Sequence, residues 1–419
     1  MPPDSDTEDF ADVEEDMEEV TLGDDLPPPE EEEDEIADGV EGINVAADDL
    51  DEEIMDDSKI IFEMHTASVF AVDVAKNDTC LVVTGGEDDK AYVWNYETAQ
   101  CLFECVGHTD SVAFCSFSAD GKYVMTADMA GGVKVFAAVG GNCVWEYECE
   151  DLEWCKWHRS ANVLFAGTLG GDMYMWMIPI GACKIYASHG SKTTCAKIAS
   201  TGKEIMCGYG DGSVKKWDLK SVSPLFHYKP NSIGEDDGGG EDAVLCMDLL
   251  DDGVKNGNLI VIGTEDGTVT LINSQTGKHI SSFLVNNTDK NISANTVEEH
   301  EEVSEVSHAV ESVAFSPCGC YVVAGSGVGI LCIWDISLQK MRHRCNSSAG
   351  VTKLIWNSAE RNIISACLDG VIRLWDHKKG ELVREITGHV GNILDIIMTN
   401  DGRYLLTAGD DCTARVFEK

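Results

Sequence analysis

The sequence predicts an all-β fold, an eight-bladed β-propeller closed by its N-terminal strand and preceded by an acidic tail. Three observations predict this fold. A short strand-like motif ending in a large apolar residue recurs eight times, its copies are about one blade apart, and the last copy lacks an outer strand. Within each copy, apolar runs alternate with turns in an order typical of four antiparallel strands.

The repeat is clearest at its eight terminal residues, which are Trp94, Phe136, Trp176, Trp217, Ile272, Trp334, Trp375 and Phe417. They are separated by 42, 40, 41, 55, 62, 41 and 42 residues, and a propeller blade of this kind takes roughly 40 to 45. The two long intervals contain acidic insertions near residues 230–243 and 286–308. Residues 58–419 are therefore expected to form one propeller with two inserted loops.

Closure of the ring is expected to use the start of this domain. The chain ends at Lys419, directly after the third strand of the eighth copy. The segment 59–64 stands in the same place relative to His65 as residues 101–107 do to His108. It can therefore supply the missing outer strand and leave no free sheet edge.

The net charge of the chain limits the kinds of partner that it can bind. Residues 1–57 hold 27 acidic residues and no Lys or Arg, which predicts a disordered acidic tail, and the rest of the chain still has 48 acids against 30 bases. Such a charge repels nucleic acids and anionic membranes and attracts basic partners. No apolar run reaches spanning length, and the first residues do not resemble a signal peptide. We expect a cytoplasmic protein with access to the nucleus, whose 17 cysteines are reduced thiols.

Details of the repeat resemble WD40 propellers. Gly-His pairs end at His108 and His389, and Trp-Asp pairs begin at Trp217, Trp334 and Trp375. An acid also stands six residues before the terminal position in five copies, at Asp88, Asp211, Asp266, Asp369 and Asp411.

The resemblance implies that this Asp accepts a hydrogen bond from the histidine of its blade, which links through Ser or Thr to the terminal indole. The residues expected in such structural networks are His65, Asp88, Trp94, His189, Asp211, Trp217, Asp369, Trp375, His389 and Asp411. Blades that end in Phe or Ile are expected to have incomplete networks.

Catalytic and metal sites are not expected. The acid run 87–89 lacks the spacing of an EF-hand loop, so a structural role for Asp88 is favoured over a metal site. The glycines of 325–329 resemble a dinucleotide fingerprint but have no helix after them, and Cys318 and Cys320 lack a second pair at zinc-finger spacing. We expect no enzyme, no cofactor and no metal.

A binding face is expected where the loops between blades and the turns before the third strands open on one side of the ring. Charge of one sign gathers there, and a large apolar side chain could anchor a partner. The candidate partner-binding residues are Glu87, Asp89, Asp110, Glu150, Asp151, Glu153, Glu265 and Asp410, with Trp154, and Tyr209 beside it, as apolar anchors.

The chain is identified as resembling the angio-associated migratory cell protein family of WD40-repeat proteins, which includes a ribosome-assembly chaperone. The resemblance rests on the motifs at 67–74, 84–94, 103–112, 151–158, 165–176, 208–220 and 367–376.

It implies that the acidic top face captures the basic N-terminal segment of a newly made large-subunit ribosomal protein. We expect a monomer, and the charge argues against direct DNA or membrane binding. The alternative is a scaffold in signalling, cell migration or ubiquitin-ligase substrate recruitment, which the same fold permits.

Overall fold

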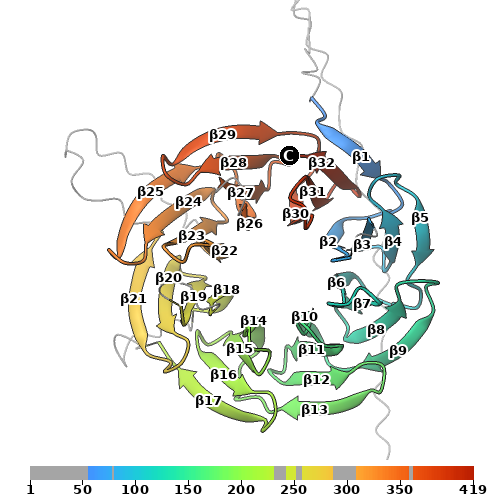
Figure 1. Cartoon of the computed structure of the whole chain (residues 1–419), viewed down its shortest axis with the longest axis horizontal. Helices are drawn as coiled ribbons and strands as arrows, with labels where there is room; N and C mark the ends of the chain where they lie inside the picture. The colour runs from blue at the N-terminus through green and yellow to red at the C-terminus, as the bar shows by residue number, and fades with distance from the viewer. Residues whose placement is uncertain (1–54, 78–79, 231–241, 252–256, 286–307, 358–361) are drawn as a thin grey trace, which may run out of the picture. The chain divides into compact units, whose positions relative to one another are not determined.

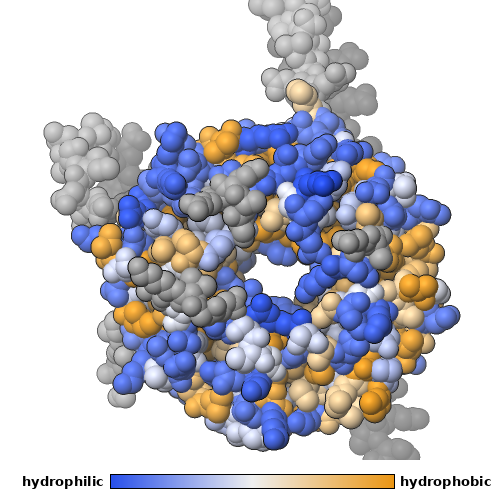
Figure 2. All heavy atoms as spheres, viewed as in Figure 1, coloured by the Kyte–Doolittle hydropathy of each residue, from blue (hydrophilic) through white to orange (hydrophobic). Residues whose placement is uncertain are grey.

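The computed structural model describes residues 55–77, 80–230, 242–251, 257–285, 308–357 and 362–419. These residues form an eight-bladed β-propeller, as predicted, with eight four-stranded antiparallel sheets arranged in a ring (Figure 1), and the space-filling view shows an open channel at its centre (Figure 2). Nearly all of the predicted acidic tail and of the two acidic insertions lies outside the described residues.

The first four blades follow one another along the chain. Blade 1 contains β2 (Val69–Val74), β3 (Leu81–Gly86), β4 (Ala91–Asn95) and β5 (Cys101–Glu104). Blade 2 contains β6 (Val112–Phe117), β7 (Tyr123–Asp128), β8 (Gly132–Ala137) and β9 (Cys143–Glu148). Blade 3 contains β10 (Leu152–Trp157), β11 (Val163–Thr168), β12 (Met173–Met177) and β13 (Ala182–Tyr186). Blade 4 contains β14 (Thr193–Ile198), β15 (Glu204–Tyr209), β16 (Val214–Asp218) and β17 (Ser223–Tyr228).

The other four blades repeat the pattern. Blade 5 contains β18 (Val244–Leu250), β19 (Leu259–Thr264), β20 (Thr268–Asn273) and β21 (His279–Leu284). Blade 6 contains β22 (Val310–Phe315), β23 (Tyr321–Ser326), β24 (Ile330–Asp335) and β25 (Lys340–Asn346). Blade 7 contains β26 (Val351–Asn357), β27 (Asn362–Cys367), β28 (Ile372–Asp376) and β29 (Glu381–Ile386). Blade 8 contains β30 (Ile393–Met398), β31 (Tyr404–Gly409), β32 (Ala414–Glu418) and β1 (Ser58–Phe62).

The predicted closure is confirmed. Strand β1 pairs antiparallel with β32, with Ile60 opposite Val416 and Phe62 opposite Ala414. An ion pair of 2.7 Å between Arg415 Nη1 and Asp56 Oδ2 lies beside this pairing. The first strand of the domain therefore completes the blade that the last three strands begin, so β32 is paired on both of its edges.

The core is divided among the junctions between blades. In the described part of the chain, each of eight apolar clusters joins two neighbouring blades. The second strand of a blade is therefore buried almost throughout, as in β3 and β31, whereas an outer strand such as β29 is largely exposed. This packing explains why the second strands are continuous apolar runs.

One irregularity recurs in all eight innermost strands. The pairing of each with its neighbour shifts by one residue near its start, so that the second residue is left out of the register. Such a β-bulge redirects the side chain at the extra residue. The eight bulge residues are Phe70, Ala113, Glu153, Thr194, Leu245, Glu311, Thr352 and Leu394.

Candidate functional site

The loops between blades and the turns after the second strands lie on one face, as predicted. In every blade the first residue of that turn donates its backbone N–H to the carbonyl just before the innermost strand, as from Glu87 to Ser68 (2.8 Å) and from Asp410 to Asn392 (2.8 Å). The same bond joins Glu265 to Ala243. Glu87, Glu265 and Asp410 therefore occupy equivalent positions in blades 1, 5 and 8.

The histidine networks fix this face. His65 Nδ1 contacts Asp88 Oδ1 at 3.0 Å, and its Nε2 contacts the Thr84 hydroxyl at 3.0 Å. The Asp88 side chain is only 4% exposed, so it is a structural residue rather than a ligand-binding one. Burial lowers the pKa of His65 although the hydrogen bond to Asp88 opposes the shift, so this histidine is neutral at pH 7.

The same triad occurs in two blades that end in Phe. In blade 8, His389 contacts Asp411 at 2.9 Å and Thr407 at 2.7 Å. In blade 2, His108 contacts the Asp128 carboxylate at 2.8 Å. Burial alone would raise the pKa of Asp128, but hydrogen bonds from His108 and a backbone amide lower it below its ordinary value. The missing indole removes one link and leaves the rest of each network in place.

Two other blades depart from the expected pattern. His189 contacts Asp211 through Nε2 at 3.0 Å, and the Trp217 indole donates to the Tyr209 hydroxyl at 3.3 Å. In blade 7 the Asp369 carboxylate pairs with Arg373 instead of a histidine.

The indole ends of the networks differ as well. Trp375 donates to the Ser365 hydroxyl at 2.9 Å, as the repeat implies. Within the described residues the Trp94 indole N–H has no acceptor. The ring of Trp94 stacks on Phe62 with centroids 4.5 Å apart, so it contributes packing rather than a hydrogen bond.

Two acidic groups occupy the predicted face. The first lies where blades 8 and 1 meet, because the Ser68 hydroxyl of blade 1 donates to Asp410 of blade 8 at 2.6 Å. Burial raises the pKa of the Cys412 thiol there, and Asp411, Asp410, Asp88 and Glu87 raise it further. Glu87, Asp89 and Asp410 are exposed. Asp89 also has a left-handed backbone, with φ of +59°, so it is both a turn residue and a surface charge.

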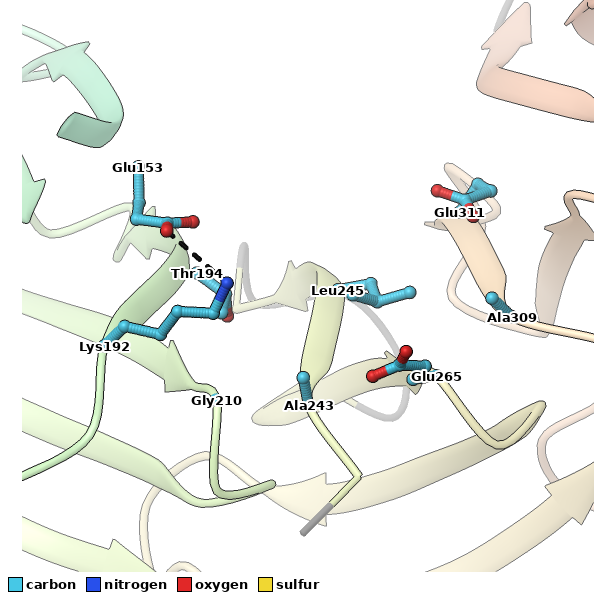
Figure 3. Close-up of a pocket in the computed structure, with 9 residues that line it drawn as sticks. All are labelled: Glu153, Lys192, Thr194, Gly210, Ala243, Leu245, Glu265, Ala309 and Glu311. Atoms are coloured by element: carbon cyan, nitrogen blue, oxygen red, sulfur yellow. Dashed lines mark hydrogen bonds and ion pairs between the residues drawn. The ribbon is translucent and has the colours of Figure 1, made fainter. Parts of the chain in front are cut away.

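The second acidic group lines a pocket of about 710 Å³ on blades 3 to 6. Figure 3 shows Glu153 and Glu311 on opposite sides of it, with Leu245 and Glu265 between them. Four bulge residues contribute to the lining, which comprises Glu153, Lys192, Thr194, Gly210, Ala243, Leu245, Glu265, Ala309 and Glu311. The bulges therefore turn inner-strand side chains toward this pocket.

The pocket carries an excess of negative charge. Its three carboxylates face one ammonium group, and Lys192 pairs with Glu153 at 3.4 Å. Removal from water raises the pKa of Glu311 above its ordinary value, and the nearby Glu265 carboxylate raises it further. A cation placed between Glu265 and Glu311 would relieve this repulsion, so the site favours an amine or guanidinium group.

The remaining predicted acids lie on the same face but outside this pocket. Glu150 and Asp151 are exposed in the loop that precedes β10, and Glu150 lies against Gly170 of the neighbouring turn. Asp110 is half-buried and accepts a hydrogen bond from the Ser111 amide at 2.8 Å.

The predicted apolar anchors are wrong. Trp154 is 3% exposed and Tyr209 is 1% exposed, and both belong to the core between blades 3 and 4. Trp154 follows the bulge at Glu153, so the bulge directs the glutamate to the pocket and the indole into the junction. Glu311 was absent from the predicted set, although its equivalence to Glu153 within the repeat could have identified it.

Some features bear on other chemistries. All 17 cysteines are free thiols. Among the residues that the structure describes, no three His, Cys, Asp or Glu side chains are grouped so as to hold a metal ion. The described ranges also contain no helix long and apolar enough to cross a membrane.

Fold and site together define a WD-repeat β-propeller with acidic groups gathered on one face. Residues 57–95, 99–136 and 182–218 match the family described as WD domain, G-beta repeat, and residues 246–417 match Nucleolar protein 10-like, N-terminal domain. The chain belongs to the angio-associated migratory cell protein family, since it is 37% identical to the Homo sapiens protein of that name over 364 residues, covering 86% of this chain and 80% of the relative.

A more distant relative is a ribosome assembly protein. The chain is 26% identical over 418 residues to Ribosome assembly protein SQT1 of Saccharomyces cerevisiae, covering 90% of this chain and 92% of that one. The crystal structure of the yeast Sqt1 matches with a TM-score of 0.75 at 23% identity, over 87% of this chain and 99% of that chain. Chaetomium thermophilum Sqt1, bound to the N-terminus of the ribosomal protein L10, matches with a TM-score of 0.72 at 22% identity, over 87% and 100%. At such identities the structures demonstrate the shared fold.

Proposed function

We propose that this protein is a non-catalytic chaperone that holds the basic N-terminal segment of a newly made large-subunit ribosomal protein on its acidic face. The observation that carries the proposal is the pocket in which Glu153, Glu265 and Glu311 outnumber Lys192. Support comes from the related Sqt1, whose crystal structure holds the N-terminus of the ribosomal protein L10. Both the charge of the pocket and the relative point to a basic peptide.

The chemistry of capture follows from the site. An Arg side chain can donate paired hydrogen bonds to a carboxylate, and a Lys side chain can neutralise the repulsion between Glu265 and Glu311. The formal net charge of −45 attracts a basic segment at long range and accelerates its association. A stronger polyanion, such as ribosomal RNA, would compete for the same basic side chains and release the client.

The first acidic group, where blades 8 and 1 meet, extends this surface. Glu87, Asp89 and Asp410 lie on the same face, so a peptide of several basic residues could contact both groups. The proposal places the protein in the cytoplasm, with access to the nucleus, as a monomer that binds neither DNA nor membranes directly.

The test is calorimetric titration of the full chain with a peptide from the basic N-terminus of ribosomal protein L10, against a scrambled peptide, at two salt concentrations. We expect tighter binding of the native order, weakened by salt. Reversing Glu265 and Glu311 to Lys should reduce affinity by at least about tenfold, since each charge-assisted bond is worth roughly 1.5–3 kcal/mol. Reversing Glu381 of β29 together with Glu148 of β9, which are exposed acids of two outer strands, changes the net charge by the same amount and should have little effect.

Each other outcome has a definite meaning. Equal binding of native and scrambled peptides would contradict a dedicated client and leave a general polycation sink. No binding of either peptide would refute the chaperone and favour the scaffold alternative, which the name of the angio-associated migratory cell protein relatives suggests.

A further inference from the structure

A ring of charged side chains lies inside the central channel, below the acidic pocket. Lys156 is three residues beyond Glu153 on β10, which is about 10 Å along a strand. Lys197 occupies the equivalent place on β14, and Lys353 reaches the channel from β26. Figure 2 shows that the channel is open and that hydrophilic residues dominate its visible rim. We refer to Lys156, Lys197 and Lys353 together as the lysine ring.

The acids of the same layer are directed away from the channel water. Asp248 accepts a hydrogen bond from the Phe315 amide of the next blade at 2.8 Å, and Asp395 accepts one from the Val72 amide at 3.1 Å. Their side chains are 23% and 16% exposed, whereas those of their partners Lys197 and Lys353 are 43% and 42% exposed. A solute in the channel therefore meets ammonium groups more readily than carboxylates.

Asp73 is the third acid of this layer and is held in the same way. Its carboxylate accepts a hydrogen bond from the Phe117 amide of blade 2 at 2.8 Å. Burial raises its pKa to about 6. Asp73 therefore holds neighbouring blades together as Asp248 and Asp395 do.

Lys156 differs from the other two lysines because its partner is uncharged. Its Nζ donates to the carbonyl of Ala196 at 3.0 Å, and within the described residues no carboxylate lies in ion-pair contact with it. Lys156 is exposed to the channel, and partial desolvation by the surrounding protein, together with the charges of Lys197 and Lys353, lowers its pKa to about 8. A lysine held between like charges without a counter-ion gains most from a bound anion.

We propose that the lysine ring binds a small phosphate-type oxyanion inside the channel, with Lys156 as its principal contact. The Lys156 ammonium group can donate charge-assisted hydrogen bonds to the oxygens of such an anion, and the nearby positive charges of Lys197 and Lys353 add to the attraction. The acidic pocket lies about one Debye length away at 0.1 M salt, so its repulsion is largely screened. This site goes beyond client capture and does not depend on it. The phosphate group could be free phosphate or part of a polyphosphorylated small molecule.

The first experiment measures protection of the ring in the full-length protein. Lysines are acetylated with limiting N-hydroxysuccinimidyl acetate, and each site is quantified by peptide mass spectrometry, in sodium phosphate, inositol hexakisphosphate or sodium chloride at equal ionic strength. We expect phosphate-containing solutes to slow acetylation of Lys156 severalfold relative to Lys122, whose side chain is 72% exposed on a hairpin outside the channel. Protection by inorganic phosphate identifies free phosphate as sufficient, and protection by inositol hexakisphosphate alone identifies a polyphosphorylated ligand. A ratio of Lys156 to Lys122 acetylation rates that is the same in all three salts would overturn the proposal.

The second experiment uses variants and ³¹P line broadening. Lys156→Met should weaken phosphate binding by about tenfold or more, because a charge-assisted donor is lost. Lys156→Arg keeps the charge and should retain binding, and Lys122→Met should match the wild type. Circular dichroism and the melting temperature confirm that each variant is folded. Unchanged broadening in folded Lys156→Met would contradict the assignment, whereas loss of L10-peptide binding alone would bear only on the proposed client.

Discussion

Phe62 is the residue on which closure of the ring depends most directly. It lies at the end of β1 and is 2% exposed, in a cluster that also contains Val416 of blade 8 and Trp94 of blade 1. Its ring stacks on Trp94 at 4.5 Å and meets Tyr92 edge-on at 5.9 Å. One side chain from the N-terminal strand therefore packs the last blade against the first.

Phe62→Ala should reduce the free energy of unfolding by about 4 kcal/mol. Truncation of a buried Phe to Ala typically costs about 3–5 kcal/mol, through lost transfer energy and the cavity that remains. The loss should lie above the lower limit of this range, because the stacked and edge-on aromatic pairs each contribute about 0.5–1.5 kcal/mol beyond the buried area. The unfolding entropy of a domain of some 360 residues is roughly 0.8 kcal/mol/K, so the melting temperature should fall by about 5 °C.

The assay is urea unfolding followed by tryptophan fluorescence, with calorimetry for the melting temperature. Met64→Ala is the matched control, because Met64 is two residues away and 50% exposed, and it should change the free energy by less than about 0.5 kcal/mol. A loss below about 1 kcal/mol for Phe62→Ala, or an equal loss for Met64→Ala, would refute the view that this strand closes the ring through its core contacts.

Two further predictions concern buried acids. Burial raises the pKa of Asp73 to about 6, so its ionisation destabilises the folded state as the pH rises from about 4 to 6. Asp73→Asn should therefore be nearly neutral at pH 4 and should stabilise the protein by about 2–3 kcal/mol at pH 7.5. The prediction would be contradicted if the urea midpoints of the variant and the wild type differed by the same amount at both pH values. Burial of Asp411 opposes its ionisation, but hydrogen bonds from His389 and Thr413 lower its pKa, so the stability that it provides is present at neutral pH and lost in acid. Asp411→Ala should reduce the free energy of unfolding by about 2–4 kcal/mol at pH 7, because His389 loses its partner. A melting temperature equal to that of the wild type would exclude this role.

The sequence predicts the propeller well because a repeat records its period directly. Residues such as Trp94 and Trp375 mark the same strand in different blades, and the segment before His65 occupies the place of an outer strand, which pairs with β32 to close the ring. The pairings of His65 with Asp88 and of His389 with Asp411 follow from the same alignment. These features depend on position within the repeat, which is visible without coordinates.

The direction of the side chains in the innermost strands was harder to predict from the sequence. Simple alternation predicts that neighbouring residues of a strand face opposite sides, but a one-residue bulge breaks that rule at the start of each inner strand. It buries Trp154, exposes Glu153 to the pocket, and gives Glu311 the equivalent place in blade 6. A single sequence does not reveal the bulge, so the face that an inner-strand residue meets could not be assigned.

The same bulges explain how one channel can present charges of opposite sign. At the mouth, the bulge residues Glu153 and Glu311 are free of ladder pairing and turn toward solvent. Three residues further along, Lys156 returns to the regular ladder and reaches the channel from the junction with blade 4. A basic segment at the mouth and an anion at the lysine ring would each meet opposite charge, and their attraction across about 10 Å would favour simultaneous binding at low salt. Phosphate should therefore strengthen peptide binding slightly if both sites exist, whereas a site for basic groups alone would show only the weakening that added salt produces.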